Sequence, residues 1–143
     1  MVRRAMQKAS RRKSWSDKLA DGAPHKVKRL DVDMAGMKAG QIMLIPSARI
    51  VDDAIRAIGA GEFIDVPTLR RRLASEYGAE VCCPITTGIL LRVVAEAAIE
   101  SNERDAPDVT PFWRVIDETT PLAAKLSCGR EFIAGRRRRE RPA

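Results

Sequence analysis

The sequence has few of the side chains that bind metals or act as nucleophiles. Its 143 residues include three cysteines and a single histidine, His25. Cys82 and Cys83 are adjacent and Cys128 is far from both, so no spacing typical of a zinc site is present. Free cysteine is among the most frequently buried residue types, which favours reduced thiols in the interior. We therefore expect neither a metal nor another cofactor.

Long hydrophobic runs are also missing. Apolar residues make up 45% of the chain, which is enough for one core, but charged residues interrupt the apolar stretches. The sequence therefore contains no segment with the length and composition of a membrane span or a secretory leader. We expect a single-domain cytoplasmic protein, nucleoid-associated if it binds DNA, with no membrane partner.

Positive charge is concentrated at the two ends of a chain whose formal net charge is +7. Residues 1–30 have ten lysines and arginines against two acidic residues, and residues 130–143 have six against two. Residues 31–129 have ten against fifteen and are acidic. This layout predicts a basic N-terminal arm, a central domain, and a basic C-terminal tail or helix with these bounds. The two ends would supply most of the attraction to an anionic polymer.

The segment 65–101 predicts two consecutive helices. In DVPTLRRRLASEYG, apolar residues recur at spacings of three and four, Asp65 is a suitable N-cap and Gly78 a suitable stop. After the link AEVCC, Pro84 fits the first turn of a second helix. The apolar face expected for this second helix consists of Ile85, Ile89, Leu90, Val93, Val94, Ala97 and Ala98. Two helices joined in this way predict a helix-turn-helix.

The flanking segments supply the other elements of an α+β domain. VKRLDVDM and GQIMLIP predict two short strands, and Trp15 with Leu19 predicts a small helix that docks on the core. Ser47 begins a helix that ends near Gly59 and provides the third element of a helix-turn-helix. WRVI is expected to be a strand followed by a loop or wing, and residues 130–139 a basic helix. The predicted fold is a winged-helix-type domain with basic extensions.

The start of the second predicted helix is the expected contact surface for nucleic acid. Free amides and the hydroxyls of Thr86 and Thr87 suit phosphate oxygens, and Gly88 permits close backbone approach. Arg92 then reaches a base edge or a phosphate. Alternatively, the threonines cap the helix, Gly88 permits helix packing and Arg92 is a solvated surface residue.

The charged residues near this surface are expected to have opposite effects on DNA binding. Glu96 and Glu100 are expected on the same flank as Arg92, where they would repel DNA and confine contact to the first two helical turns. Arginines on the first helix and in the C-terminal tail are expected to bind phosphates: Arg70, Arg71, Arg72, Arg136, Arg137 and Arg138.

The segment VTPFWRVI, taken with GEFIDVPTLRRRLA and CPITTGI, resembles the DNA-binding domain of alkylguanine-DNA alkyltransferases and alkyltransferase-like proteins. The similarity spans about residues 44–118. In that family an opening motif I-P-x-G-K-V-x-x-Y precedes the helix-turn-helix, and Pro-Cys-His-Arg-Val carries the nucleophilic cysteine. Pro111, Arg114 and Val115 match the second motif. The opening motif is matched loosely by Ile58, Gly61, Glu62 and Phe63.

The departures from the family pattern decide the expected chemistry. Phe112 stands at the position of the acceptor cysteine and Trp113 at that of its histidine, so the resemblance implies no alkyl transfer. Phe112 is expected to line the family's base pocket with Trp113 pointing inward, because neighbouring side chains on an extended segment face opposite sides. Val66 replaces the tyrosine that helps to rotate a nucleotide, and Arg92 is the candidate for the arginine finger. Base flipping is therefore not expected.

These patterns together predict a non-catalytic nucleic-acid-binding protein, with double-stranded DNA as the expected partner. The resemblance adds Phe112 and Arg114 to the predicted binding site. One alternative is a ribosome-associated, RNA-associated or protein-interaction module that uses the basic ends. A second is an enzyme using Cys83 at a helix start, where amide dipoles lower a thiol pKa, although no histidine or lysine lies nearby in the sequence.

Overall fold

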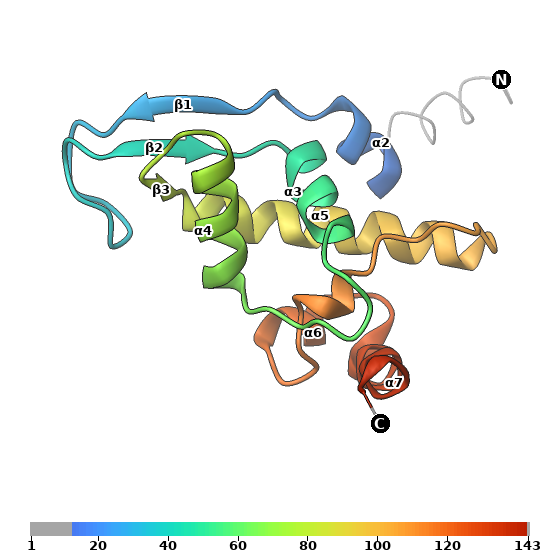
Figure 1. The fold of residues 1–143 in the computed structure, drawn as a ribbon. Helices are drawn as coiled ribbons and strands as arrows, with labels where there is room; N and C mark the ends of the chain where they lie inside the picture. The colour runs from blue at the N-terminus through green and yellow to red at the C-terminus, as the bar shows by residue number, and fades with distance from the viewer. Residues whose placement is uncertain (1–12, 143) are drawn as a thin grey trace, which may run out of the picture.

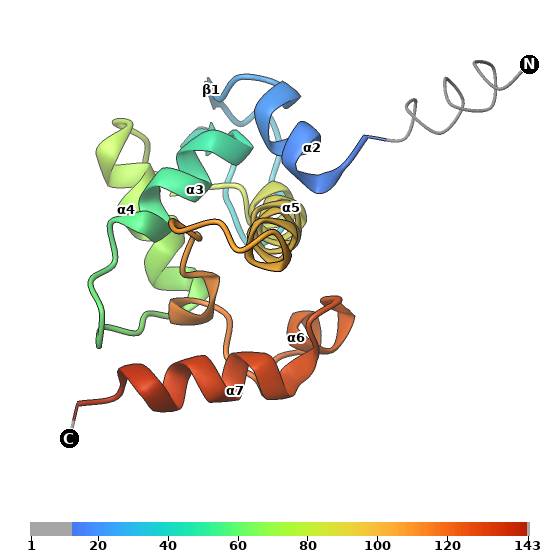
Figure 2. The same cartoon turned by 90° about the vertical axis from the view of Figure 1, so that its right-hand side faces the viewer.

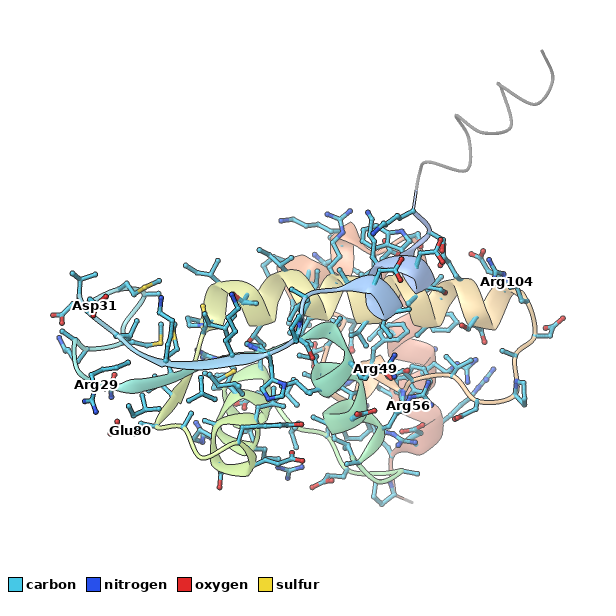
Figure 3. All side chains as sticks on the ribbon, turned by 90° about the horizontal axis from the view of Figure 1, so that it is seen from above. Arg29, Asp31, Arg49, Arg56, Glu80 and Arg104 are labelled. Atoms are coloured by element: carbon cyan, nitrogen blue, oxygen red, sulfur yellow. The ribbon has the colours of Figure 1, made fainter. Side chains whose placement is uncertain are left out.

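One long helix, α5 (Pro84–Glu103), runs through the middle of the molecule (Figure 1). The computed structural model describes residues 13–142, and in it the other elements are arranged around α5, three of them in extensive contact with it. Figure 2 looks along α5, with α2 (Trp15–Asp21) on one side, α6 (Pro121–Lys125) and α7 (Gly129–Glu140) on the opposite side, and α3 (Ala48–Arg56) and α4 (Val66–Glu76) on a third. Arg104, at the C-terminal end of α5, lies at the opposite end of the molecule from Asp31 (Figure 3). The fold is α+β, as predicted.

Three short strands form a small mixed sheet at one end of the helices. They are β1 (Lys26–Arg29), β2 (Ile42–Ile45) and β3 (Val81–Cys82). β2 lies in the middle and pairs antiparallel with β1 and parallel with β3. Met43 and Leu44 of β2 are buried, whereas every residue of β1 is exposed. β1 and β2 confirm the two predicted strands; β3 lies in the predicted link between the helices and was too short to show alternation.

Helices α3 (Ala48–Arg56) and α4 (Val66–Glu76) begin at the predicted caps. The side chains of Ser47 and Asp65 each accept a hydrogen bond from an amide in the first turn that follows. Gly78 has a φ of +70°, the left-handed conformation predicted for the residue that stops α4. The helices on both sides of the expected turn are therefore confirmed, although the link between them includes a strand.

The N-terminal part of the described chain belongs to the folded body. Helix α2 (Trp15–Asp21) begins with a capping box between Ser14 and Asp17, and it packs along α5. Glu100 of α5 accepts hydrogen bonds from the Ser16 amide at 2.9 Å and from the Ser16 hydroxyl at 3.1 Å. Residues 15–29 are therefore part of the domain, rather than of a basic arm ending at residue 30; the predicted arm over residues 1–12 lies outside the described residues.

After α5 the chain forms helical turns. These are η1 (Phe112–Arg114), α6 (Pro121–Lys125) and α7 (Gly129–Glu140), which confirms the predicted basic helix. The prediction of a strand at WRVI is wrong, because the amides of Val115 and Ile116 fold back to the Phe112 carbonyl. No strand follows α5 among the described residues, so a wing is not found in this segment.

Helix α5 buries part of the predicted face, since Val94, Ala97 and Ala98 point inward as predicted, whereas the first turns do not follow the prediction. Ile85 and Ile89 are 56% and 62% exposed. The buried residues are Thr87, Leu91, Val94, Ala95, Glu96, Ala97, Ala98 and Ile99. Because apolar residues occur all around this helix, their periodicity does not determine which side packs inward. No helix within residues 13–142 is both long and apolar enough to cross a bilayer.

Candidate nucleic-acid interface

The largest hollow near the predicted contact surface runs along the exposed side of α5. We call it the α5 groove; its volume is about 800 Å³. Helices α2 and α6 flank α5 on this side (Figure 2). The lining residues are Trp15, Lys18, Val66, Ile85, Gly88, Ile89, Leu91, Arg92, Val93, Leu122 and Lys125. The groove therefore combines an apolar floor with three cations and no carboxylate.

Two of the three cations lie against a tryptophan. The ammonium of Lys18 is 4.2 Å from the centroid of the Trp15 ring, and the guanidinium carbon of Arg92 is 5.6 Å from it. Neither these two residues nor Lys125 forms an ion pair within the described chain. All three charges are thus available to an external anion. Lys18 and Lys125 were not predicted, since they come from helices that only the fold brings beside Arg92.

The predicted residues at the start of α5 divide into two groups. Gly88 is exposed and has open space around it, as a close backbone approach requires. Thr87 is fully buried and donates a hydrogen bond to the Cys83 carbonyl at 2.7 Å, so its predicted phosphate contact is wrong. Thr86 is half-buried, and its hydroxyl donates to the Cys83 sulfur at 3.4 Å. Cys83 makes no side-chain capping bond, so the amides of the first turn keep their donor capacity.

The two carboxylates expected to repel DNA point into the protein. Glu96 is 4% exposed and accepts hydrogen bonds from the Ser127 amide and hydroxyl. Glu100 accepts hydrogen bonds from the amides of Trp15 and Ser16 at the start of α2. Their predicted repulsion is therefore wrong, because both side chains stabilise the packing around α5. The outward side of α5 next to Arg92 is left without a negative charge from these two residues.

The three arginines of α4 have three different environments. Arg72 forms an ion pair with Glu62 at 3.1 Å, which lowers the pKa of that carboxyl. Arg71 is exposed and donates to the Thr68 hydroxyl at 3.0 Å. Arg70 is half-buried, and its Nε is enclosed without a hydrogen-bond partner. The three arginines are therefore not equivalent as phosphate contacts. Arg71 is the most accessible to a ligand, and Arg72 is already paired with Glu62.

The predicted pocket residue Phe112 belongs to the core. Phe112 is fully buried and Trp113 is 4% exposed. Both rings pack with Phe132 of α7, at centroid distances of 6.1 and 6.4 Å respectively. The inward direction predicted for Trp113 is confirmed, and the pocket position predicted for Phe112 is wrong. A 3₁₀ turn sends successive side chains about 120° apart, so both rings can face the same core, as an extended strand would not allow.

Two predicted nucleic-acid contacts, Arg114 and Arg137, are used inside the protein. The guanidinium of Arg114 donates to both carboxylate oxygens of Glu140, at 2.8 and 3.0 Å, and its side chain is 15% exposed. The hydrogen bonds from Arg114 hold the pKa of Glu140 below its ordinary value. Arg137 donates to the Trp113 carbonyl at 2.7 Å and lies 3.4 Å from Asp117. Both predictions are therefore wrong, because these charges join α7 to the rest of the fold.

The remaining predicted tail arginines differ in accessibility. Arg136 lies over the rings of Trp113 and Phe132, at 5.0 and 5.1 Å, and donates to the Asn102 side chain at 3.2 Å. Arg136 is thus partly buried over two rings, but it forms no ion pair within residues 13–142. Arg138 is exposed and forms no ion pair within residues 13–142. Of the predicted tail residues it is the most accessible to an outside partner.

The thiols are poorly placed for nucleophilic catalysis. Cys82 and Cys83 are buried, and Cys128 is partly buried. Burial raises the pKa of the Cys82 and Cys128 thiols, which keeps both protonated at neutral pH. No cluster of three or more metal-ligating side chains occurs within residues 13–142.

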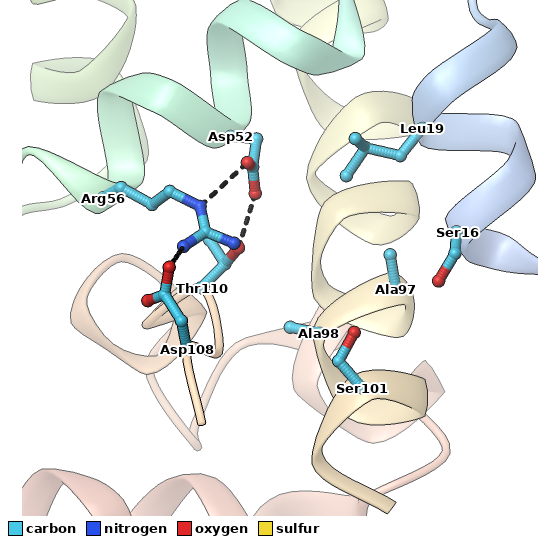
Figure 4. Close-up of a pocket in the computed structure, with 9 residues that line it drawn as sticks. All are labelled: Ser16, Leu19, Asp52, Arg56, Ala97, Ala98, Ser101, Asp108 and Thr110. Carbon is cyan, nitrogen blue, oxygen red and sulfur yellow. Dashed lines mark hydrogen bonds and ion pairs between the residues drawn. The ribbon is translucent and has the colours of Figure 1, made fainter. Parts of the chain in front are cut away.

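A smaller hollow, of about 140 Å³, lies between α3, α5 and the segment that follows α5 (Figure 4). Its buried carboxylate, Asp52, accepts hydrogen bonds from the Thr110 hydroxyl and from Nε of Arg56 at 3.0 Å. Arg56 also pairs with Asp108 at 2.9 Å. Because these charged groups bind one another, we assign the cluster to holding α3 against residues 108–110.

The chain matches no known family model, no curated protein and no solved structure. No relative therefore carries a function over to it, and the α5 groove is the strongest site that the described residues form.

Proposed function

We propose that this chain is a non-catalytic nucleic-acid-binding protein that contacts its ligand through the α5 groove, with duplex DNA as the principal candidate. The observation that carries the proposal is the charge of the groove: Lys18, Arg92 and Lys125 line it, and no carboxylate does. Cations that neutralise phosphates and release counterions supply most of the sequence-independent affinity for nucleic acid.

In this proposal α4 and α5 act as the helix pair of a helix-turn-helix-like module, and the nucleic-acid backbone lies along the exposed side of α5, between α2 and α6. Free amides and exposed Gly88 at the start of α5 allow close approach to a phosphate. Arg92 contacts a base edge or phosphate, while Lys18 and Lys125 bind phosphates on either side. Arg138 and the basic residues of the N-terminal arm add attraction that does not depend on sequence.

The absence of catalysis is a separate part of the proposal. Phe112 occupies the position at which the resembled alkyltransferases carry their cysteine, and its ring is enclosed in the core. Incubation with a duplex containing methylated guanine, followed by measurement of the intact protein mass, tests this part. We expect an unchanged mass; a stoichiometric gain of one methyl group would overturn it.

The choice of nucleic acid is tested by equilibrium titration at several salt concentrations. The ligands are a duplex DNA, the same duplex with an alkylated guanine, and an RNA of the same sequence. We expect affinity for duplex DNA that falls steeply with salt. Tighter binding to the alkylated duplex would show that the protein also recognises the lesion. Tighter binding to RNA than to DNA would identify RNA as the ligand. Binding of none of the three at low salt would refute the proposal.

A second candidate function is the docking of an acidic amphipathic helix from a partner protein. The exposure of Ile85 and Ile89, four residues apart on α5, favours it, since apolar anchors at this spacing suit a helix-in-groove contact. The same three cations would then pair with carboxylates of the partner. A lysine substitution at Ile89 separates the two candidates, as described below.

A further inference from the structure

A third hollow lies at the start of α4 and shares no lining residue with the α5 groove. We call it the Arg70 cleft; its volume is about 210 Å³. It is bounded by α4, by β3 and by the turn in the connection between β1 and β2. The lining residues are Ala35, Gly36, Met37, Pro67, Arg70, Arg71, Ala74, Glu80, Val81 and Cys82. Two arginines that are adjacent in the sequence thus line the same hollow as a tight backbone turn.

Arg70 supplies the first observation. Its Nε is enclosed by the protein and has no hydrogen-bond partner. Buried polar groups are nearly always hydrogen-bonded, and an unpaired charged donor is costly to leave in that state. Because this Nε is closed off from solvent, an anion in the cleft would bind the terminal nitrogens of Arg70, which form no hydrogen bond or ion pair with the other side chains of residues 13–142. Neighbouring Arg71 uses one nitrogen for the Thr68 hydroxyl and has further donors available.

The turn supplies the second observation. Met34 and Met37 exchange backbone hydrogen bonds of 3.0 and 2.8 Å around a two-residue loop. Ala35 and Gly36, the two loop residues, have φ angles of +49° and +82°. Neither of their amides donates a hydrogen bond within the described chain. Successive free amides in a turn are a recurrent anion-binding arrangement. An alanine in the left-handed conformation is also strained, as residues at binding sites often are.

The charge of the cleft favours an anion. Its one carboxylate, Glu80, lies at the same end of the molecule as the β1–β2 connection (Figure 3). Oε1 of Glu80 accepts a hydrogen bond from the Ile42 amide at 2.8 Å. Burial raises the pKa of the Cys82 thiol, so this residue adds no negative charge at neutral pH. Two arginines against one carboxylate leave the lining net positive.

We propose that the Arg70 cleft binds a phosphate group, which accepts hydrogen bonds from Arg70, Arg71 and the amides of Ala35 and Gly36. Planar guanidinium groups bind phosphate oxygens in pairs, and the free turn amides complete the contact. The group can be inorganic phosphate or part of a nucleic acid. This site goes beyond the proposed function, because it uses none of the residues of the α5 groove and stands if that groove binds a protein instead.

The test is a titration of the full ¹⁵N-labelled chain with inorganic phosphate at constant ionic strength, followed through its amide resonances. We expect saturable shifts at Ala35, Gly36, Arg70 and Arg71. Arg70→Gln should weaken binding at least tenfold, whereas Arg49→Gln, which removes an exposed arginine of α3, should leave it unchanged. Glu80→Gln should tighten binding several-fold. Shifts that stay linear with concentration, or that are the same with chloride, would overturn the proposal.

The source of the phosphate is found with two short oligonucleotides that differ only in a 5′-phosphate. Displacement of inorganic phosphate by the phosphorylated form alone assigns the cleft to a terminal phosphate, and displacement by both assigns it to the backbone. Displacement by neither assigns it to the free anion. If Arg70→Gln does not fold, Arg70→Lys replaces it, since lysine keeps the charge but loses the paired terminal donors of the guanidinium. Saturable cleft shifts in the unsubstituted chain already decide whether the site exists.

Discussion

The α5 groove and the cluster around η1 and α7 are both rich in cations and apolar side chains, yet they use them in opposite ways. In the cluster, Arg114 and Arg137 bind Glu140, Asp117 and backbone carbonyls. In the groove, Lys18 and Arg92 lie against the Trp15 ring and form no ion pair within residues 13–142, and two isoleucines are exposed. The number of cations in a segment therefore does not show whether they are available to a ligand. Their carboxylate partners decide it.

The largest expected effect is on the stability of the cluster. Phe112→Ala and Trp113→Ala should each lower the free energy of unfolding by about 3–5 kcal/mol, because each removes a buried aromatic ring. Ile89→Ala in the groove should change it by no more than about 0.5 kcal/mol. Urea unfolding followed by circular dichroism measures all three. A small effect of Phe112→Ala would restore the pocket role predicted from the sequence.

The next effect concerns the ion pair between Arg114 and Glu140. Glu140→Gln should cost about 2 kcal/mol at pH 7, since it leaves a largely buried guanidinium without its charged acceptor. Because folding lowers the pKa of Glu140 from its ordinary value of 4.5, the stabilisation is complete above that pH and is lost as the pH falls through the folded-state pKa.

This pH dependence is checked by measuring the free energy of unfolding from pH 7 to pH 3, for Glu140→Gln and for the unsubstituted chain. The two curves should converge at the acidic end. Glu131→Gln is the matched control, because it removes an exposed carboxylate from the same helix and should cost a few tenths of a kcal/mol at most. A constant gap between the curves at every pH would show that the ion pair is not the source of the effect.

Local signals in the sequence predicted the elements well. Ser47, Asp65 and Gly78 act on their own neighbours, so a cap or a stop can be recognised without the rest of the fold. The direction of the first turns of α5 could not be predicted, because Ile85 and Leu91 are equally apolar, and only the placement of β2, α3 and α4 around Leu91 decides which of the two is buried.

The site was harder to predict than the elements. Arg92 and Gly88 were recognised because they lie on one helix, whereas Lys18 and Lys125 come from segments far apart in the chain. Glu96 was assigned the wrong role, since its partner Ser127 is 31 residues away and leaves no local pattern. The groove and the cluster differ in whether their cations are paired with carboxylates far away in the chain. A single sequence does not show these pairings.

A smaller effect separates the two candidate functions of the groove. Ile89→Lys should leave the melting temperature unchanged, because Ile89 is 62% exposed, and should maintain or increase affinity for nucleic acid by adding a cation. Docking of an acidic helix would be weakened, since an apolar anchor is lost. Fluorescence anisotropy with labelled duplex DNA measures the change. A loss of DNA affinity would indicate that the apolar floor, rather than the charge, dominates binding.

The central claim is that nucleic acid binds at the α5 groove, and its most direct test compares two triple variants with the same net charge. One replaces Lys18, Arg92 and Lys125 with glutamine. The other makes the same change at Lys28, Arg49 and Arg104, which are exposed and lie outside the groove.

Affinity for duplex DNA is measured for both triple variants and the unsubstituted chain over a range of salt concentrations. The groove variant should lose affinity on the order of tenfold or more, and its salt slope should fall by about one for each phosphate contact removed. The second variant should stay close to the unsubstituted chain. Equal losses in the two variants would contradict the account, because they would show attraction to net charge alone and no binding site on α5.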